Sequence, residues 1–301
     1  MKRILVTGLA VVAVAAALWL HYPPFRLLVL VATRHSPVCP LGMALQSTAN
    51  EREQIAIKDR ILHAMHFVKK DGALELWQTP GGDFWIPAGN RYVLPFNLAE
   101  IERHVYGQGE HFIHPGDIVL DCGASDGDFS RQALAAGAGL VVAIELAPTT
   151  IECLRRNLAG PIAAGKAIVY PKGVWNREAE LPLSVEEQNF AANSVVLHPS
   201  GSKNAGTAPL TTVDHLAAEL HLPRVDFIKM DIEGAEIPAL AGAADVIARF
   251  HPRLAITTEH RPTDEIDIPA AVRARWSGYH MACGPCLEEH GHIRPDVLYF
   301  F

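Results

Sequence analysis

The sequence predicts an α/β fold whose main domain is a doubly wound, mostly parallel sheet. From residue 117 onward, short apolar runs typical of buried strands alternate with segments of helical periodicity. A glycine-rich turn follows the first of these runs, and a charged cluster follows the fourth. Because repeated strand–helix–strand units need right-handed crossovers, we expect parallel strands with helices on both faces of the sheet.

The composition supports a packed globular chain and argues against a nucleic-acid partner. Hydrophobic residues make up 49% and charged residues 20% of the 301 residues, which is ordinary for a domain with a large core. The formal net charge of -7 offers no basic field to a phosphate backbone. Five cysteines are an odd number and too sparse for a disulfide framework, which predicts a reducing compartment.

Residues 1–34 predict an N-terminal membrane anchor. Lys2 and Arg3 precede an uncharged apolar run over 4–20, roughly 17 residues, which is the lower limit for a membrane-crossing helix. A cleaved signal peptide is the alternative, although the run is long for a signal core. The two basic residues favour the cytoplasmic side, so a single span would export the main domain. A turn at 21–24 that returns 25–32 to the membrane interface would keep that domain cytoplasmic, which is the placement we expect.

Residues 35–110 predict a small α+β lead-in. Apolar side chains at helical spacing between charged ones predict an amphipathic helix over 47–70. Two aromatic-rich runs, 74–77 and 84–86, flank the turn-forming residues 79–83 and predict a hairpin. We expect this lead-in to pack on the main domain or to cap its cleft.

Residues 111–301 predict the main domain. Its predicted strands and helices alternate along the chain. Pro148 lies in the first turn of one predicted helix, and a solvent-exposed antiparallel insertion follows the third strand. The predicted strands are 118–120, 140–144, 167–170, 225–230 and 254–258, with 297–300 as an edge strand; the predicted helices are 129–136, 148–158, 213–220 and 237–250; the insertion is 181–185 with 194–197.

The turn after the first strand predicts a ligand loop, because ligands bind beyond the carboxyl ends of parallel strands. Gly123 and Gly127 let the backbone turn sharply and approach a ligand. Ser125 stands where a dinucleotide loop of the G-x-G-x-x-G pattern would need glycine. The loop therefore does not match the pattern expected for a nicotinamide cofactor.

Acidic residues in the same loop point to a cationic ligand. They would repel a pyrophosphate but attract the ammonium and sulfonium groups of S-adenosylmethionine. Glu145, which ends the second strand, is placed to accept hydrogen bonds from ribose hydroxyls, a role that nicotinamide enzymes share. The acidic residues of the loop are Asp121, Asp126 and Asp128.

A second cluster follows the fourth strand. The segment 227–236 is too apolar at its start and too charged at its end to be a merely solvent-exposed strand end. The alternative is that its acidic residues only cap the start of a helix. Its charged residues are Lys229, Asp231, Glu233 and Glu236.

Together these motifs resemble the FkbM-type methyltransferases, whose pattern pairs a D-x-G-A-x-x-G loop with K-x-D-x-E-G-x-E downstream. The resemblance extends over about 92–260 and implies a Rossmann-like class I methyltransferase fold with S-adenosylmethionine as cofactor. Ser125, where many relatives have Asn, and Leu146, where Pro is common, depart from the family pattern. The expected cofactor-binding residues are Asp121, Gly123, Ala124, Asp126, Gly127, Glu145 and Asp231; the expected catalytic residues are Lys229, Asp231, Glu233, Glu236 and His260.

The resemblance implies O-methylation of a hydroxyl on a sugar, a lipid-linked glycan or a polyketide-like acceptor. His260 or Asp231 is the candidate base, and Lys229 either polarises the acceptor or pairs with Glu233. No metal is expected, although Asp231, Glu233 and Glu236 could act as oxygen ligands. The competing hypotheses are a non-catalytic membrane-bound binding module and an NAD-dependent oxidoreductase.

The segment Cys283-Gly-Pro-Cys286 predicts a Gly-Pro turn between two small buried residues. A redox motif would need a helix start after an early strand, whereas this segment lies near the end of the chain. A zinc site with the nearby His290 and His292 is the other alternative.

Overall fold

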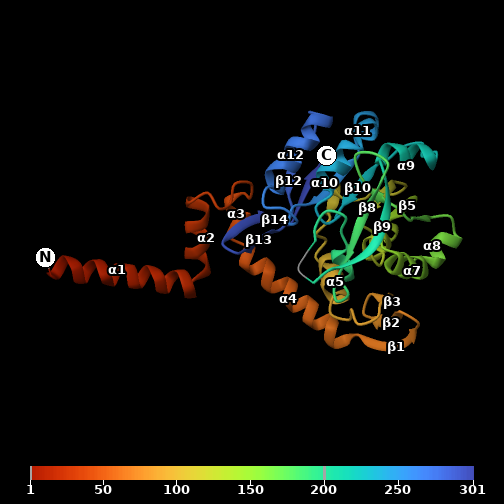
Figure 1. Cartoon of the computed structure of the whole chain (residues 1–301). Coiled ribbons are helices and arrows are strands. Elements are labelled where there is room, and N and C mark those ends of the chain that lie inside the picture. Colours follow the sequence, from red (N-terminus) through yellow and green to blue (C-terminus); the bar gives the residue numbers. More distant parts are fainter. Residues whose placement is uncertain (1, 199–200) are drawn as a thin grey trace.

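A computed structural model describes residues 2–198 and 201–301, with side chains described for residue 7 and from residue 12 onward. A long N-terminal helix extends away from the rest of the chain, and a small sheet of β1 to β3 lies below the main domain in the view of Figure 1. Lys2 and Arg3, on which the predicted orientation of the anchor depends, lie outside the described side chains.

The main domain is built on a seven-stranded mixed sheet of order β12-β15-β11-β10-β4-β5-β6. The five strands from β11 to β6 are parallel, which confirms the predicted doubly wound core. The prediction of an edge strand at 297–300 was wrong, because β12 pairs with the outer side of β15. The strands are β4 (Ile118–Cys122), β5 (Leu140–Ile144), β6 (Ala167–Tyr170), β10 (Phe227–Met230), β11 (Arg253–Thr257), β12 (Met281–Cys283) and β15 (Val297–Phe300).

Helices cover both faces of this sheet because its strand residues alternate between two apolar layers. Leu120 and Val142 face the layer formed by α9 to α12, whereas Val119 and Val141 face α6. The predicted helix 237–250 is divided in two at Gly242–Ala243. The helices are α6 (Asp128–Ala135), α7 (Pro148–Asn157), α8 (Ala159–Ala163), α9 (Val213–Glu219), α10 (Glu236–Ala241), α11 (Ala244–Phe250) and α12 (Asp264–Arg275).

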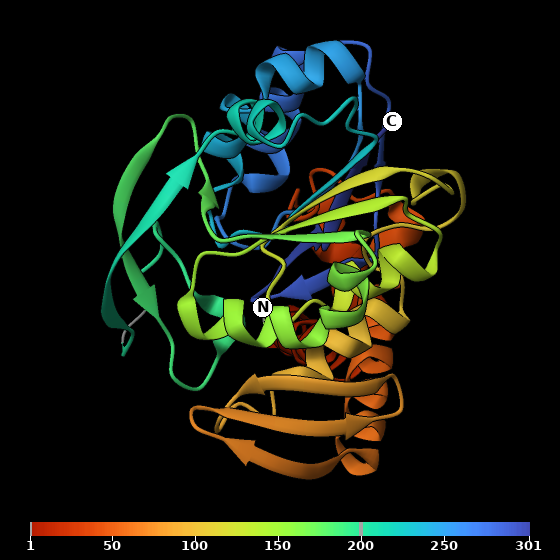
Figure 2. The ribbon, with the colours of Figure 1, turned by 90° about the vertical axis from the view of Figure 1, so that its right-hand side faces the viewer.

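The lead-in forms a three-stranded sheet that packs on α7 (Figure 2). The predicted hairpin is confirmed, but the predicted helix over 47–70 ends at Ala64. Phe67 and Val68 have side chains that favour strands, and this segment pairs with the hairpin, with Val68 at a bulge between Phe67 and Lys69. The lead-in elements are α4 (Ser47–Ala64), β1 (His66–Asp71), β2 (Leu74–Thr79), β3 (Gly82–Pro87), α5 (Leu94–Glu102) and η1 (Gly109–His111).

The insertion after β6 forms a separate sheet of order β7-β9-β8. The predicted strand 181–185 is present as part of β8, but the segment that pairs along β8 is 203–211. Residues 194–197, which were predicted to pair with it, contribute only a bridge between Ser184 and Ser194. The elements are β7 (Gly173–Val174), β8 (Ala179–Val185), η2 (Phe190–Ala192) and β9 (Lys203–Thr211).

The N-terminal helices are α1 (Lys2–His21), α2 (Pro23–Ala32) and α3 (Leu41–Ala44). The expected turn before Pro23 is present. Within the described part of the chain, no individual helix has the length and apolarity that a membrane crossing needs; Val12–His21 and Pro23–Ala32 have them only as a pair bent by 106°.

A disulfide between Cys39 and Cys286 joins the N-terminal segment to the hairpin of β13 (Cys286–Glu289) and β14 (His292–Pro295). The prediction that the cysteines stay reduced was therefore wrong. The number and spacing of the cysteines did not indicate this disulfide, because Cys39 and Cys286 are separated by 247 positions and meet only in the folded chain. Cys286 is not available for a zinc or redox site in this state, and Cys283 is a half-buried free thiol before the Gly-Pro connection.

Candidate active site

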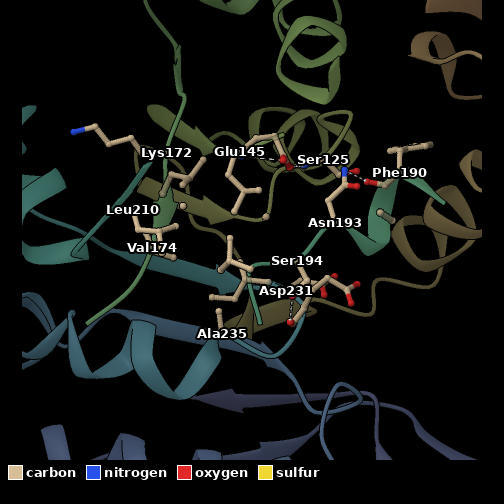
Figure 3. A pocket seen from close by; sticks show the side chains of 18 residues that line it. Ser125, Glu145, Lys172, Val174, Phe190, Asn193, Ser194, Leu210, Asp231 and Ala235 are labelled. Atoms are coloured by element: carbon tan, nitrogen blue, oxygen red, sulfur yellow. Dashed lines mark hydrogen bonds between the residues drawn. The ribbon is translucent and has the colours of Figure 1, made fainter. Parts of the chain in front are cut away.

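Two pockets lie beyond the carboxyl ends of β4, β5 and β10. The inner pocket (Figure 3) is closed by apolar side chains and by Glu145. The outer pocket, a cavity of about 380 Å³, lies between the start of α5 and a group of carboxylates. Five residues line both pockets, so the two spaces meet: Gly123, Ser125, Ala191, Asp231 and Glu233.

The loop between β4 and α6 passes very close to the end of β10. A Cβ atom on Gly123 would lie 1.8 Å from the backbone oxygen of Asp231, and the φ angle of 79° also favours glycine. Gly127 has a φ of 89°, and a Cβ there would lie 2.8 Å from Leu154. The two glycines predicted to shape this loop are therefore required by close packing.

Glu145 is held at the inner pocket by backbone donors. Ser125 N donates to its Oε2 over 3.1 Å, and Leu146 N and Ala147 N donate to its Oε1 over 2.9 and 2.8 Å. Burial raises the pKa of Glu145, and these hydrogen bonds counteract part of that effect. Figure 3 shows its side chain directed toward Ser125. The carboxylate is therefore fixed in place, and the remaining lone pairs of its oxygens can still accept hydrogen bonds.

Lys229 joins the two sequence motifs. Its Nζ donates to Gly123 O over 2.7 Å and lies 3.3 Å from Asp121 Oδ1 and 3.9 Å from Asp231 Oδ2. Burial lowers the pKa of Lys229, but the charges of Asp121 and Asp231 outweigh it and keep the ammonium protonated. The pairing of Lys229 with Glu233 that the sequence suggested was wrong, because the ion-pair partners of Lys229 are Asp121 and Asp231. Asp121 also accepts a hydrogen bond from Ser130 Oγ over 2.7 Å.

Asp231 stands where the two pockets meet. Tyr106 OH donates to its Oδ2 over 2.7 Å, and Thr257 Oγ1 lies 3.4 Å from its Oδ1. Burial raises the pKa of Asp231, but the positive charges of Lys229 and His260 outweigh it and hold this pKa below the usual range. Tyr106 comes from the lead-in and carried no motif that would have marked it.

His260 lies behind Asp231 and lines neither pocket. Its Nδ1 lies 3.0 Å from Glu236 Oε1, and its Nε2 lies 3.5 Å from both Asp231 Oδ1 and Glu233 Oε1. Burial lowers the pKa of His260, but the carboxylates of Glu233, Glu236 and Asp231 outweigh it and raise this pKa well above the usual value. Glu236 is fully buried, so it positions His260 rather than contacting a ligand.

Four of the expected cofactor contacts are buried away from the pockets. Asp121, Ala124, Asp126 and Gly127 line neither of them. Ser125 has a φ of 49°, so the chain reverses and Asp126 points inward, where burial raises its pKa well above the usual value. The prediction that Asp126 faces a cationic ligand was wrong.

The outer pocket contains one acidic residue of the predicted loop, Asp128, and several residues that the sequence motifs did not indicate. Burial raises the pKa of Asp128 to about 6 and that of Glu259 to about 7. The lead-in contributes aromatic and amide side chains, and the insertion adds two further amides. These residues are Tyr92, Phe96, Asn97, Glu100, Asp128, Gln188, Asn189 and Glu259.

A family profile described as the methyltransferase FkbM domain matches residues 121–295, more than half of the chain. The chain belongs to the FkbM methyltransferase family. The matched span contains both motifs and extends through the C-terminal hairpin. The family is one of S-adenosylmethionine-dependent methyltransferases, which is the family that the two sequence motifs implied.

Two solved structures are distantly similar to this FkbM protein. Methyltransferase FkbM from Methylobacillus flagellatus KT is 18% identical with a TM-score of 0.46; the match covers 85% of this chain and 60% of that one. TYW2 from M. jannaschii, solved in complex with AdoMet, is 15% identical with a TM-score of 0.38. The match covers 79% of this chain and 90% of that one. The chain thus spans less than two thirds of the length of the first protein. No curated protein sequence matches it.

Proposed function

We propose that the chain transfers a methyl group from S-adenosylmethionine to a hydroxyl of a sugar, a lipid-linked glycan or a polyketide-like acceptor. The observation that carries this proposal is that two pockets of different character meet at Asp231 and Glu233. A donor in one and an acceptor in the other would have their reacting groups side by side, which is the main requirement of an in-line methyl transfer.

The inner pocket fits the donor. Apolar walls suit an adenine ring, and the fixed carboxylate of Glu145 suits the ribose hydroxyls. The negative side chains of Asp231 and Glu233 favour a cationic group. S-adenosylmethionine supplies a methyl group activated by its sulfonium. The apolar wall residues are Ile144, Leu146, Val174, Phe190 and Leu210.

The outer pocket fits a hydroxyl-rich acceptor. Tyr92 and Phe96 offer aromatic faces on which the apolar face of a sugar ring can pack. Asn97, Gln188 and Asn189 offer amides that can donate to and accept from hydroxyl groups. A pocket with a few polar groups among larger side chains fixes the orientation of a small ligand.

Asp231 is our candidate for the group that receives the acceptor proton. It lines both pockets, whereas His260 lies behind it and lines neither. Tyr106 and Lys229 hold one side of the carboxylate, which leaves Oδ1 directed at the rest of the cluster. We propose that Asp231 orients the hydroxyl and accepts its proton, and that Lys229 holds Gly123 and Asp231 in register.

Binding and labelled-methyl transfer would test this function with the full chain. Calorimetry should show binding of S-adenosylmethionine and none of NAD, because the loop lacks the dinucleotide glycine pattern. Radiolabelled methyl groups should then appear in a glycan or lipid fraction, and Asp231→Asn should abolish that transfer. Binding without transfer to any fraction would favour a non-catalytic binding module, and binding of NAD alone would favour an oxidoreductase.

We also propose that α1 and α2 attach the chain to a membrane, as a bent pair. Exposed Val12, Val14, Leu18 and Leu20 on α1 support this, since apolar side chains gain by leaving water. A cytoplasmic main domain would have access to the cofactor, whereas the disulfide of Cys39 favours an oxidising compartment. Protease protection of sealed vesicles, combined with alkaline extraction, would establish both the attachment and the side.

A further inference from the structure

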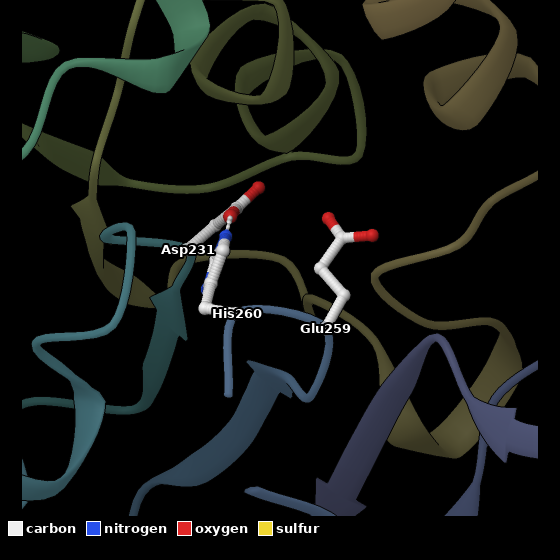
Figure 4. A group of neighbouring side chains, drawn as sticks. All are labelled: Asp231, Glu259 and His260. Atoms are coloured by element: carbon white, nitrogen blue, oxygen red, sulfur yellow. Dashed lines mark ion pairs between the residues drawn. The ribbon is translucent and has the colours of Figure 1, made fainter. Parts of the chain in front are cut away.

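Three side chains that can bind metal ions, those of Asp231, Glu259 and His260, converge beside the outer pocket (Figure 4). One ligand atom from each of Asp231, Glu259 and His260 lies within 4.8 Å of the others. Asp231 follows β10, and the other two residues follow β11, so neighbouring parallel strands bring them together. Glu233 adds a third carboxylate, whose Oε1 lies 3.5 Å from His260 Nε2.

His260 is aimed at these carboxylates by a second residue. Glu236 Oε1 lies 3.0 Å from Nδ1 and also accepts from Ile232 N over 3.0 Å, which fixes the carboxylate. When Nδ1–H donates a hydrogen bond to this carboxylate, Nε2 is left as the ligating nitrogen, an arrangement that recurs behind metal-bound histidines. The pair thus orients the imidazole with Nε2 directed at Asp231 and Glu233.

Nε2 points into the cluster and faces the carboxylates of Asp231 and Glu233. The side chain of His260 is only 6% exposed, and the carboxylate oxygens of Asp231 and Glu233 lie 3.5 Å away, beyond an ordinary hydrogen-bond length. A buried nitrogen facing two oxygens across such a gap leaves room for a bridging cation.

We propose that Asp231, Glu259 and His260 bind a divalent cation of the Mg²⁺ and Mn²⁺ class, with Glu233 as a further ligand. Carboxylates and water suit these hard cations, and one imidazole favours Mn²⁺ over Mg²⁺. The negative charges of the three carboxylates also attract such a cation. The side chain of Glu259 is 40% exposed, so the site is open to ions and to the acceptor.

The role of this cation rests on the proposed function. A cation here would polarise the acceptor hydroxyl and lower its pKa. The proton would leave through Asp231 to solvent while the oxygen forms its bond to the methyl carbon. The electron pair of the breaking carbon–sulfur bond would return to sulfur, which becomes a neutral thioether. Charge and atoms balance without any further reactant.

Mn²⁺ binding to the chelator-treated full chain tests the site directly. Titration followed by electron paramagnetic resonance should show one bound ion per chain. Glu259→Gln should weaken this binding about 10-fold or more, because losing a direct ligand should cost at least as much as losing an outer-shell partner, about 10- to 100-fold. Glu51→Gln, which removes an exposed carboxylate on α4, should leave it unchanged. No binding, or equal binding by Glu259→Gln, would overturn the proposal.

Nitrogen coupling provides a second measurement that does not depend on a folded variant. Electron spin echo modulation of bound Mn²⁺ should show a directly bound nitrogen whose frequency changes on labelling histidine with ¹⁵N. A bound ion without that coupling would exclude His260 and overturn the site. Calorimetry with S-adenosylmethionine on the same metal-free sample separates the hypotheses, because donor binding without Mn²⁺ binding contradicts only the metal site.

Discussion

Lys229 Nζ lies 3.3 Å from Asp121 Oδ1, and the two residues are direct neighbours in the register of β10 and β4. The pair joins the loop motif to the downstream charged motif beneath the site. Their side chains are 5% and 0% exposed, so both charges are withdrawn from water. The chain therefore uses one buried ion pair to hold two sequence motifs together.

Removing one member of this pair should destabilise the fold. We expect Lys229→Met to lower the free energy of unfolding by about 3–5 kcal/mol, because it leaves the charge of Asp121 buried and uncompensated. Urea denaturation measures this loss. The double variant Asp121→Asn with Lys229→Met should regain part of the stability, since no unpaired charge remains. Equal stability of wild type and Lys229→Met would contradict the assignment.

Gly123→Ala should disrupt the ligand loop. Its Cβ would lie 1.8 Å from Asp231 O, and the left-handed backbone alone costs a non-glycine residue about 1–3 kcal/mol. We expect a lower thermal midpoint and loss of S-adenosylmethionine binding by calorimetry. Gly160→Ala is the matched control, because no atom lies within 4 Å of its Cβ position. Similar behaviour of the two variants would argue against a tight loop.

Glu145→Gln should weaken binding of the donor while the fold is retained. The amide keeps the shape of the side chain but loses the charge that strengthens hydrogen bonds to hydroxyls. Such bonds contribute about 1.5–3 kcal/mol, so we expect a calorimetric Kd higher by about 10- to 150-fold. Glu51→Gln, far from the pockets in sequence, serves as the control. An unchanged Kd for Glu145→Gln would place the ribose elsewhere.

Phe96→Ala should weaken binding of the acceptor and leave binding of the donor unchanged. Phe96 lines the outer pocket only and is 44% exposed, so its truncation should be tolerated by the fold. Loss of one apolar contact in such a pocket is worth about 1–3 kcal/mol. Once an acceptor is found, steady-state kinetics should show a raised acceptor KM and an unchanged Kd for S-adenosylmethionine. A raised donor Kd would contradict the assignment of the two pockets.

The disulfide should stabilise the chain without taking part in the reaction. Under denaturing, non-reducing conditions, thiol titration should detect three free cysteines, namely Cys122, Cys153 and Cys283. Cys39→Ser should lower stability by about 2–5 kcal/mol. Binding of S-adenosylmethionine should persist, because neither Cys39 nor Cys286 lines a pocket. Five reactive thiols in the unreduced protein would show that the bond does not form.

The sequence alone determined the alternating strands and helices, the glycine loop and the charged segment after β10, because these depend on local periodicity and on short motifs. Glu145 and Asp231 were predicted as site residues, and both line the inner pocket.

The tertiary structure decided which residues meet. It placed Asp126 inward, paired Lys229 with Asp121, brought Tyr106 from the lead-in to Asp231, and joined Cys39 to Cys286. Periodicity specifies which face of an element is apolar, but it carries no record of strand order or register. Contacts between residues far apart in the chain are fixed only when the whole sheet and its covering layers pack together.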